Sequence, residues 1–440
     1  MKNENIKKWL RRGGLTLAFA VLFVFLYVLS ALSGLRFFIP HYLTIAGGPF
    51  ESKSYLVILQ NNNELRPAGG RIVAYGKITF NNGLFGDIEL SNPDEALTNH
   101  EYIDAPYPME ELLWDESYKG YTFFDANFNP DFEKTVNDLL GMYKLTHPDV
   151  EFDGAIGLNI NVLKDIIDIT GNVKIGDEVI TSSNIFEKLE NSDDTTLRAI
   201  GRSVIFKSSW SFVSWRDLSD MFVKNLNEKH IQLYSFNKNF QKKLEEKNWS
   251  GKWPTGYKGD FLAAIEANFG KNQINKYINR ALNYRLYLCD PKTDKYCEYT
   301  GKVAYTIEHI DRAPEAEKYT GYIRFYFPKK TNLKSSNVFV NYENNEDYFV
   351  VGTIVSLNPG ERKTIEMTAE LPETIFDQET YSLYIPKQSG TSGDSYSVII
   401  ETPTGTEVES RSFDVHENIA SWQGALSKDK TLSLSVTKPL

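Results

Sequence analysis

Residues that usually mark enzymes and metalloproteins are scarce in this sequence. Its 440 residues include only two cysteines and six histidines, and the histidines do not cluster. The Gly-x-Ser-x-Gly motif of serine hydrolases and the His-Glu-x-x-His motif of zinc peptidases are both missing. The sequence therefore excludes the serine hydrolase and zinc peptidase classes.

Positive charge is also in short supply outside the N-terminus. The net charge is −10, although residues 1–12 carry five basic residues against one acidic residue. The rest of the chain is therefore more acidic than the whole. A surface of that sign repels phosphates, so nucleic acid is excluded as a partner.

Only one long stretch lacks charged residues, and it covers residues 13–35. Its 23 residues are enough to cross about 30 Å of hydrocarbon as a helix. Basic residues precede it, which predicts a cytoplasmic tail over residues 1–12 and an extracytoplasmic location for the rest. We therefore expect an uncleaved, single-pass anchor in the lipid bilayer of the cell membrane. A cleaved signal peptide is the alternative, although its apolar region would be shorter.

Beyond a stem at residues 36–54, the patterns predict two domains. Residues 55–290 read as an α/β (α+β) domain. Its expected strands are 55–60, 71–80, 84–90 and 152–158, and its expected helices are 130–143 and 161–170. Residues 300–440 alternate apolar and polar side chains in many short segments, which predicts a β-sandwich.

The two cysteines, Cys289 and Cys297, flank a turn-like segment that contains Pro291. An extracytoplasmic location permits oxidation, so we expect a disulfide across a hairpin. Two free thiols are the alternative.

The densest polar segment reads QNNNELRPAGGR over residues 60–71, with a loop expected at residues 61–70. It follows a buried strand, where α/β folds often bind ligands. Arg66 and Arg71 could hold an anionic group, with Asn62 and Glu64 beside them. The alternative is structural, with Arg66 paired to a carboxylate such as Asp125 or Asp153. The segment matches neither a P-loop nor a dinucleotide fingerprint.

Two further acidic sites, Asp125 with Asp131 and Asp153 alone, are candidates for binding. Asp125 precedes the helix expected at residues 130–143 and Asp131 stands at its start, where they could bind a divalent cation such as Mg²⁺ or cap the helix. Asp153 precedes a glycine at the start of a buried strand, where it could orient an arginine or act as a base. A plain turn aspartate is an equally ordinary interpretation.

Several of these motifs resemble a bacterial membrane-anchored family known as domain of unknown function 4012. The segments that carry the resemblance are YLVILQNNNELRPAGG at 55–70, NFNPDF at 127–132, DGAI at 153–156, TGNV at 170–173, DFL at 260–262 and PKQSG at 386–390. The resemblance implies a location and an order of elements, but no reaction.

The order of elements is also similar to that of the LytR–CpsA–Psr family, whose members transfer glycopolymers from a lipid pyrophosphate to the cell wall. This similarity implies that Arg66 is a pyrophosphate ligand. That family's second arginine-aspartate motif has no clear match here, since residues 87–94 are acidic.

These observations predict a membrane-anchored envelope protein that binds, and in one version transfers, an envelope glycopolymer or its polyprenyl-pyrophosphate precursor. A second hypothesis is a non-enzymatic surface protein that acts through its β-sandwich. A third is a cation sensor built on Asp125 and Asp131. No cofactor is required by any of these motifs, apart from the divalent cation considered above.

Overall fold

The computed structural model describes the chain except for residues 1–32, 94–103, 114–120, 212–213, 290–296, 311–316, 378 and 438–440. The predicted cytoplasmic tail and nearly all of the predicted membrane segment lie outside the described residues. Only residues 33–35 of that segment are described, in the 3-10 helix η1 (Ser33–Phe37). None of the helices within the described ranges is long and apolar enough to cross a membrane.

The N-terminal half is built on a five-stranded sheet in the order β3-β2-β1-β4-β7. β1 and β4 are parallel, and the other neighbours are antiparallel. The strands are β1 (Ser52–Arg66), β2 (Gly69–Asn81), β3 (Leu84–Ser91), β4 (Gly154–Asn159) and β7 (Ile231–Ser235), and a small hairpin adds β5 (Val173–Ile175) and β6 (Glu178–Ile180). The expected strands 55–60, 71–80, 84–90 and 152–158 correspond to β1 to β4, whereas β7 is not among the expected strands.

Helices cover both faces of this sheet because β1 is apolar on both sides. Leu56 and Ile58 pack against α5, while Val57 and Leu59 pack toward α6 to α8. The helices are α4 (Met109–Leu113), α5 (Phe132–Thr146), α6 (Ile160–Thr170), α7 (Ile185–Glu190), α8 (Asp194–Trp210), α9 (Trp215–Asn227) and α10 (Lys238–Glu246), with short η2 (Ile39–His41), α2 (Tyr42–Ala46) and η3 (Phe123–Asp125).

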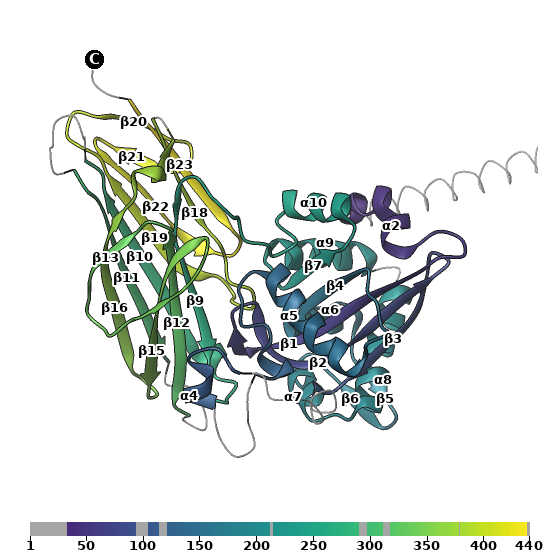
Figure 1. Ribbon diagram of the computed structural model, residues 1–440. Helices are drawn as coiled ribbons and strands as arrows, with labels where there is room; N and C mark the ends of the chain where they lie inside the picture. Colours follow the sequence, from purple (N-terminus) through teal and green to yellow (C-terminus); the bar gives the residue numbers. More distant parts are fainter. Residues whose placement is uncertain are drawn as a thin grey trace, which may run out of the picture.

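The C-terminal half is rich in strands and stands beside the α/β half (Figure 1). Its sheets have the orders β13-β16-β11-β10-β19-β22-β21, β14-β15-β12-β9 and β17-β18-β23-β20, with β8 paired to β18. Side chains from all three sheets form one large apolar core, including Leu282, Phe325 and Leu383. This β-rich half therefore buries its own core, separate from that of the α/β half.

The strands of the β-rich half run almost to the end of the chain. They are β8 (Asp260–Phe261), β9 (Ala263–Asn268), β10 (Ile278–Tyr287), β11 (Tyr299–His309), β12 (Tyr319–Pro328), β13 (Asn332–Ser336), β14 (Asn341–Glu343), β15 (Tyr348–Leu357), β16 (Arg362–Leu371), β17 (Phe376–Asp377), β18 (Thr380–Ile385), β19 (Asp394–Glu401), β20 (Glu407–Glu409), β21 (Asp414–His416), β22 (Ile419–Leu426) and β23 (Lys430–Thr437), with η5 (Asn275–Tyr277) and η6 (Glu373–Ile375) between them.

The boundary between the halves lies earlier than expected. β9 pairs with β12, and β10 pairs with β11 and β19, so the β-rich half begins at β8 rather than near residue 300. Local patterning records which side chains are buried but not which sheet a strand joins. Between β10 and β11, Cys289 and Cys297 form a disulfide with their Cα atoms 5.4 Å apart.

We expect the α/β core to depend on Phe132, which is fully buried at the start of α5. Phe132→Ala should lower the free energy of unfolding by about 3–5 kcal/mol, because it removes a large side chain from a packed core. Urea unfolding of the full chain measures this change. Phe339→Ala is the matched control, since Phe339 is 81% exposed, and it should change the free energy by less than about 0.5 kcal/mol.

Candidate functional site

The expected polar loop at residues 61–70 is instead the end of a β-hairpin. β1 continues to Arg66 and β2 begins at Gly69, so only Pro67 and Ala68 connect the strands. The register shifts between Leu59 and Gln60 and again between Asn61 and Leu65. Bulges of this kind turn side chains out of their regular alternation. The polar residues of the hairpin tip thus point into the protein, and they meet the β-rich half.

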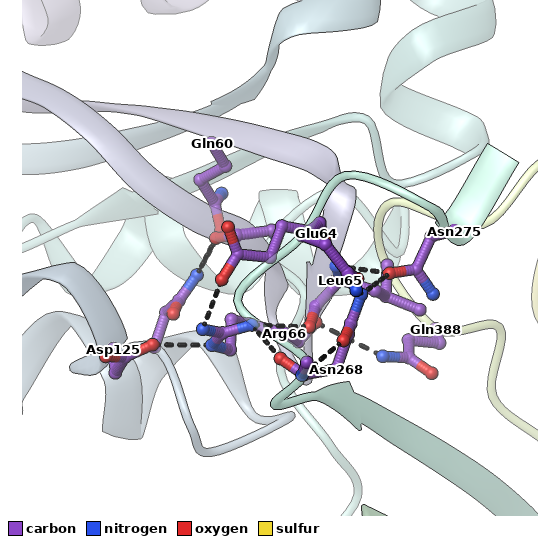
Figure 2. Close-up of polar contacts among 12 residues, drawn as sticks. Gln60, Glu64, Leu65, Arg66, Asp125, Asn268, Asn275 and Gln388 are labelled. Carbon is purple, nitrogen blue, oxygen red and sulfur yellow. Dashed lines mark hydrogen bonds and ion pairs between the residues drawn. The ribbon is translucent and has the colours of Figure 1, made fainter. Parts of the chain in front are cut away.

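Arg66 is the centre of this arrangement and is only 1% exposed. Its Nε donates to Asp125 Oδ1 at 2.5 Å, and its Nη2 donates to Glu64 Oε1 at 2.9 Å (Figure 2). The Phe269 ring covers the guanidinium, with its centroid 5.3 Å from Cζ. The observed partner is therefore a carboxylate, as the structural alternative for Arg66 expects.

The two carboxylates owe their stability in the interior to this arginine. Burial raises the pKa of Glu64, and the positive charge of Arg66 opposes that rise. Asp125 is held in place by η3 and is as deeply buried as Arg66. A buried charge is costly unless it is paired and hydrogen-bonded. Each charge in the trio thus depends on the others.

Hydrogen bonds to backbone groups link the Arg66 trio to the β-rich half. Arg66 Nη1 donates to the carbonyl oxygens of Leu65, at 3.1 Å, and of Asn268 at the end of β9. The Leu65 amide donates to Asn275 Oδ1 at 2.9 Å. One guanidinium therefore bridges two carboxylates of the α/β half and a carbonyl of the β-rich half.

A second segment of the β-rich half, residues 386–390, closes over the hairpin. The Gln388 side-chain Nε2 donates to the carbonyl oxygens of Arg66, at 3.1 Å, and of Glu266, at 2.7 Å. Asn62 Nδ2 donates to the Gly390 carbonyl at 3.2 Å. We call the Arg66 trio and these contacts the interdomain junction.

Glycines allow this close approach of two backbones. A Cβ on Gly390 would lie 2.3 Å from the Gly69 carbonyl oxygen, and Gly390 has a φ of 87°. A Cβ on Gly70 would lie 2.1 Å from the Asn61 carbonyl oxygen. Gly390 therefore admits the backbone of Gly69, and Gly70 admits the backbone of Asn61 within the hairpin.

Two buried lysines, Lys229 and Lys387, lie at the segment of residues 386–390. Lys229 Nζ and Asp429 Oδ1 are 2.7 Å apart, and both side chains are buried. The backbone amide of Lys387 donates to the same Asp429 oxygen at 2.8 Å. Burial lowers the pKa of the Lys387 ammonium to about 7. The junction therefore holds a lysine that is close to losing its charge near neutral pH.

The other predicted site residues do not join the Arg66 trio by hydrogen bonds. Arg71 stacks on Phe124, with its Cζ 4.1 Å from the ring centroid. Asp153 lies at the opposite end of β1, where it pairs with Lys53 at 2.9 Å. Asn62 and Glu64, in contrast, are part of the junction.

The two aspartates considered as metal ligands have structural partners. Asp125 pairs with Arg66, as described above. Asp131 caps α5 by accepting from the Glu133 amide at 2.9 Å, and it also accepts from the Trp253 amide at 3.3 Å. Burial raises the pKa of Asp131. Across the described ranges, we find no group of three or more His, Cys, Asp or Glu side chains arranged to hold a metal ion.

A small polar cleft of about 170 Å³ lies where α5 faces the β-rich half. Its lining includes Asp131, Arg324 and Glu343, and the last two side chains pair at 3.6 Å. Pockets that bury small-molecule ligands usually measure roughly 300–1,000 Å³. The cleft is thus smaller than a typical ligand site, and its charged groups already have partners.

Sequence reasoning missed the amide side chains that the β-rich half brings to the junction, namely Asn268, Asn275 and Gln388. A weak signal existed, because most of these amides stand in or beside apolar strands and Gln388 lies in the PKQSG segment.

We predict that Arg66→Met destabilises the protein by about 3–5 kcal/mol, since it leaves two buried carboxylates without the cation that hydrogen-bonds to both. Denaturant unfolding measures the loss. The double variant Arg66→Met/Asp125→Asn should recover part of it, because one uncompensated charge is removed. Arg71→Met serves as the control and should change stability far less. Equal losses in Arg66→Met and Arg71→Met would contradict a central role for Arg66.

Lys387 should make stability depend on pH. Its pKa of about 7 in the folded protein lies below the ordinary value of 10.5. Between these two values the unfolded chain binds more protons, so the free energy of unfolding should rise with pH. Lys387→Met should remove this contribution, whereas Lys242→Met, at an exposed position, should keep it. Urea unfolding at pH 7, 8 and 9 provides the comparison, and identical slopes in both variants would refute the prediction.

Known proteins resemble this chain only in part. No curated protein matches it. Among solved structures, the transcriptional regulator yvhJ from Bacillus subtilis shows 10% identity over 45% of this chain and 76% of its own, with a TM-score of 0.25. Protein gbs0355 from Streptococcus agalactiae shows 12% identity over 48% and 77%, with a TM-score of 0.29. An M1 zinc metallopeptidase from Deinococcus radiodurans shows 10% identity over 37% and 43%, with a TM-score of 0.22.

Structural similarity at these TM-scores carries no argument about fold or function, and the similarity to the LytR–CpsA–Psr family stays a prediction. A family model, in contrast, matches residues 51–193. Those residues include the β1–β2 hairpin and Asp125. The part of the chain that supplies the Arg66 trio thus matches the family described as protein of unknown function (DUF4012).

Proposed function

We propose that this chain is a membrane-anchored protein of the cell envelope that acts without catalysis. In this proposal the α/β half is a platform, and the β-rich half, folded as the expected β-sandwich, binds a partner. The supporting observation is the burial of Arg66 in the interdomain junction. A pyrophosphate needs cations that it can reach. The side chain best suited to that role is instead engaged in joining the two halves.

An edge strand of the β-rich half is the surface best suited to a partner. β14 is the outer strand of its four-stranded sheet. The aromatic side chains of Phe339 and Tyr342 are exposed on and beside it. Edge strands offer unpaired backbone groups to an added strand, and aromatic side chains are enriched in protein interfaces. We therefore expect an extended segment of another envelope protein to pair with β14.

A photo-crosslinking amino acid at Tyr342 tests this proposal in cells. We expect one discrete protein adduct from that position, because the partner strand would lie against it. The control position is Leu145, an exposed apolar residue of α5 in the α/β half, and it should give no such adduct. The absence of an adduct at Tyr342, or the same adduct from both positions, would count against the proposal.

Thermal unfolding with polyprenyl pyrophosphates, with and without Mg²⁺, separates this proposal from the transferase hypothesis. Ligand binding to the folded state raises the melting temperature, and we expect no such rise. A rise that disappears in Arg71→Met but persists in Lys242→Met would favour a pyrophosphate site instead.

Binding of an envelope glycopolymer is a second candidate. It is favoured by an open groove of about 680 Å³ near the C-terminal end of the β-rich half. The groove is lined by hydroxyl groups and by charged side chains, including Thr380, Ser435, Glu409 and Arg411. Such groups can hydrogen-bond to sugar hydroxyls. Calorimetric titration with envelope polysaccharide would detect this binding, and Arg411→Ala should weaken it.

A further inference from the structure

Exposed apolar side chains gather at the N-terminal end of the α/β half. Phe50 is 98% exposed, Leu84 is 70% exposed, and Ile39 and Leu43 are each 63% exposed. Isolated surface apolar residues are ordinary, but a cluster indicates an interaction site. We define the apolar patch as Ile39, Tyr42, Leu43, Phe50, Leu84 and Phe85.

Hydrogen bonds hold the three chain segments of the apolar patch together. The Tyr42 hydroxyl donates to the Gly83 carbonyl. The Phe50 amide donates to Asn82 Oδ1 at 2.8 Å, and the Asn82 amide donates to the Glu51 carbonyl at 2.9 Å. The patch is therefore a fixed surface in which α2, the segment before β1 and the β2–β3 turn lie side by side (Figure 1).

The backbone at Phe50 is strained. Its ring is almost fully exposed, so packing of the ring does not explain this conformation. Its φ is 68°, in the left-handed region that a glycine would occupy more easily. A non-glycine residue held there costs on the order of 1–3 kcal/mol, and such strain is common at functional sites. The strain places a phenyl ring almost entirely in solvent, so a ligand for that ring is the simplest reason for it.

The position of the apolar patch in the chain indicates what covers it. The uncharged run at residues 13–35 ends only four residues before Ile39. Four residues span at most about 14 Å. If residues 13–35 cross the bilayer, the patch must begin within that distance of the lipid.

Basic and aromatic side chains extend the same end of the α/β half. α8 runs antiparallel to β3, because Arg198 bonds to the Leu90 carbonyl while Arg202 pairs with Asp87. The C-terminal end of α8 therefore lies toward the β2–β3 turn. That end exposes Phe206 and Trp210.

The exposed rings of α8 line a groove of about 630 Å³ together with Lys174 and Lys207, and with Arg202 in its pair with Asp87. Aromatic rings beside basic side chains are typical of the membrane–water interface, where the cations attract anionic headgroups. The groove, like the apolar patch, is therefore suited to the membrane–water interface.

We propose that the apolar patch lies in the interface of an anionic phospholipid bilayer, so that the α/β half rests on the membrane instead of swinging from its anchor. The proposal rests on the membrane anchoring proposed above. Phe50 and Leu84 enter the boundary between headgroups and acyl chains, as apolar side chains of interfacial segments do. Lys174 and Lys207, which line the groove at the end of α8, face the phosphates.

Nitroxide labels on the full chain test this proposal in vesicles of phosphatidylglycerol and phosphatidylethanolamine. The variants Phe50→Cys and Leu84→Cys place the label in the patch. Phe339→Cys places it on an exposed phenylalanine of the β-rich half. We expect the ratio of collision with oxygen to collision with a water-soluble nickel chelate to be several-fold higher at 50 and 84 than at 339. Unchanged melting temperatures would show that the variants fold.

Three outcomes would overturn the proposal. Labels at 50 and 84 that are as accessible to the chelate as the label at 339 would show that the patch faces water. Broadening of their spectra that grows with protein density in the vesicle would show that a second copy covers the patch. Release of the full chain from the vesicles at alkaline pH would show that the anchor itself is absent. Retention of the chain with water-accessible labels would refute the patch alone and leave the anchor intact.

Discussion

The buried pairing of Arg66 with Asp125 and Glu64 is the interaction on which the rest of the structure depends. Each of the three charges would be very unfavourable alone in the interior, and the β-rich half supplies a carbonyl that completes their hydrogen bonding. The two apolar cores account for the stability of each half. The trio and its amide neighbours join one half to the other, together with a buried apolar cluster in which Phe128 meets Phe269 and Tyr322.

Much of the α/β half was predictable, because β1 to β4, α5 and α6 have clear apolar periodicity and clear end signals. Gly171 ends α6 as expected, with a φ of 85°. The hairpin tip was not predictable in the same way. Asn61, Pro67 and Gly70 are ordinary loop signals, yet here bulges and long-range hydrogen bonds keep the segment in strands. For the same reason, spacing alone could name Asp125 and Asp153 as possible partners of Arg66 but could not choose between them.

β1 connects the two features that matter most for the proposed role. Its first residue, Ser52, lies beside the apolar patch, and its last residue, Arg66, lies in the junction. A strand of 15 residues spans about 50 Å at most. If the patch rests on lipid, this strand acts as a rigid spacer that holds the β-rich half away from the bilayer. β14 and the groove near the C-terminal end of the β-rich half could then bind other envelope components.

The separation of the junction's parts along the chain has a consequence for biosynthesis. Gln388 follows Arg66 by 322 positions, and Asn268 follows it by 202. The α/β half therefore emerges from the ribosome long before its polar hairpin tip can be covered. A nascent chain must keep an arginine and two carboxylates hydrated at the edge of an otherwise finished domain. Premature termination anywhere before the PKQSG segment would leave that edge without the contacts of Gln388 and Gly390.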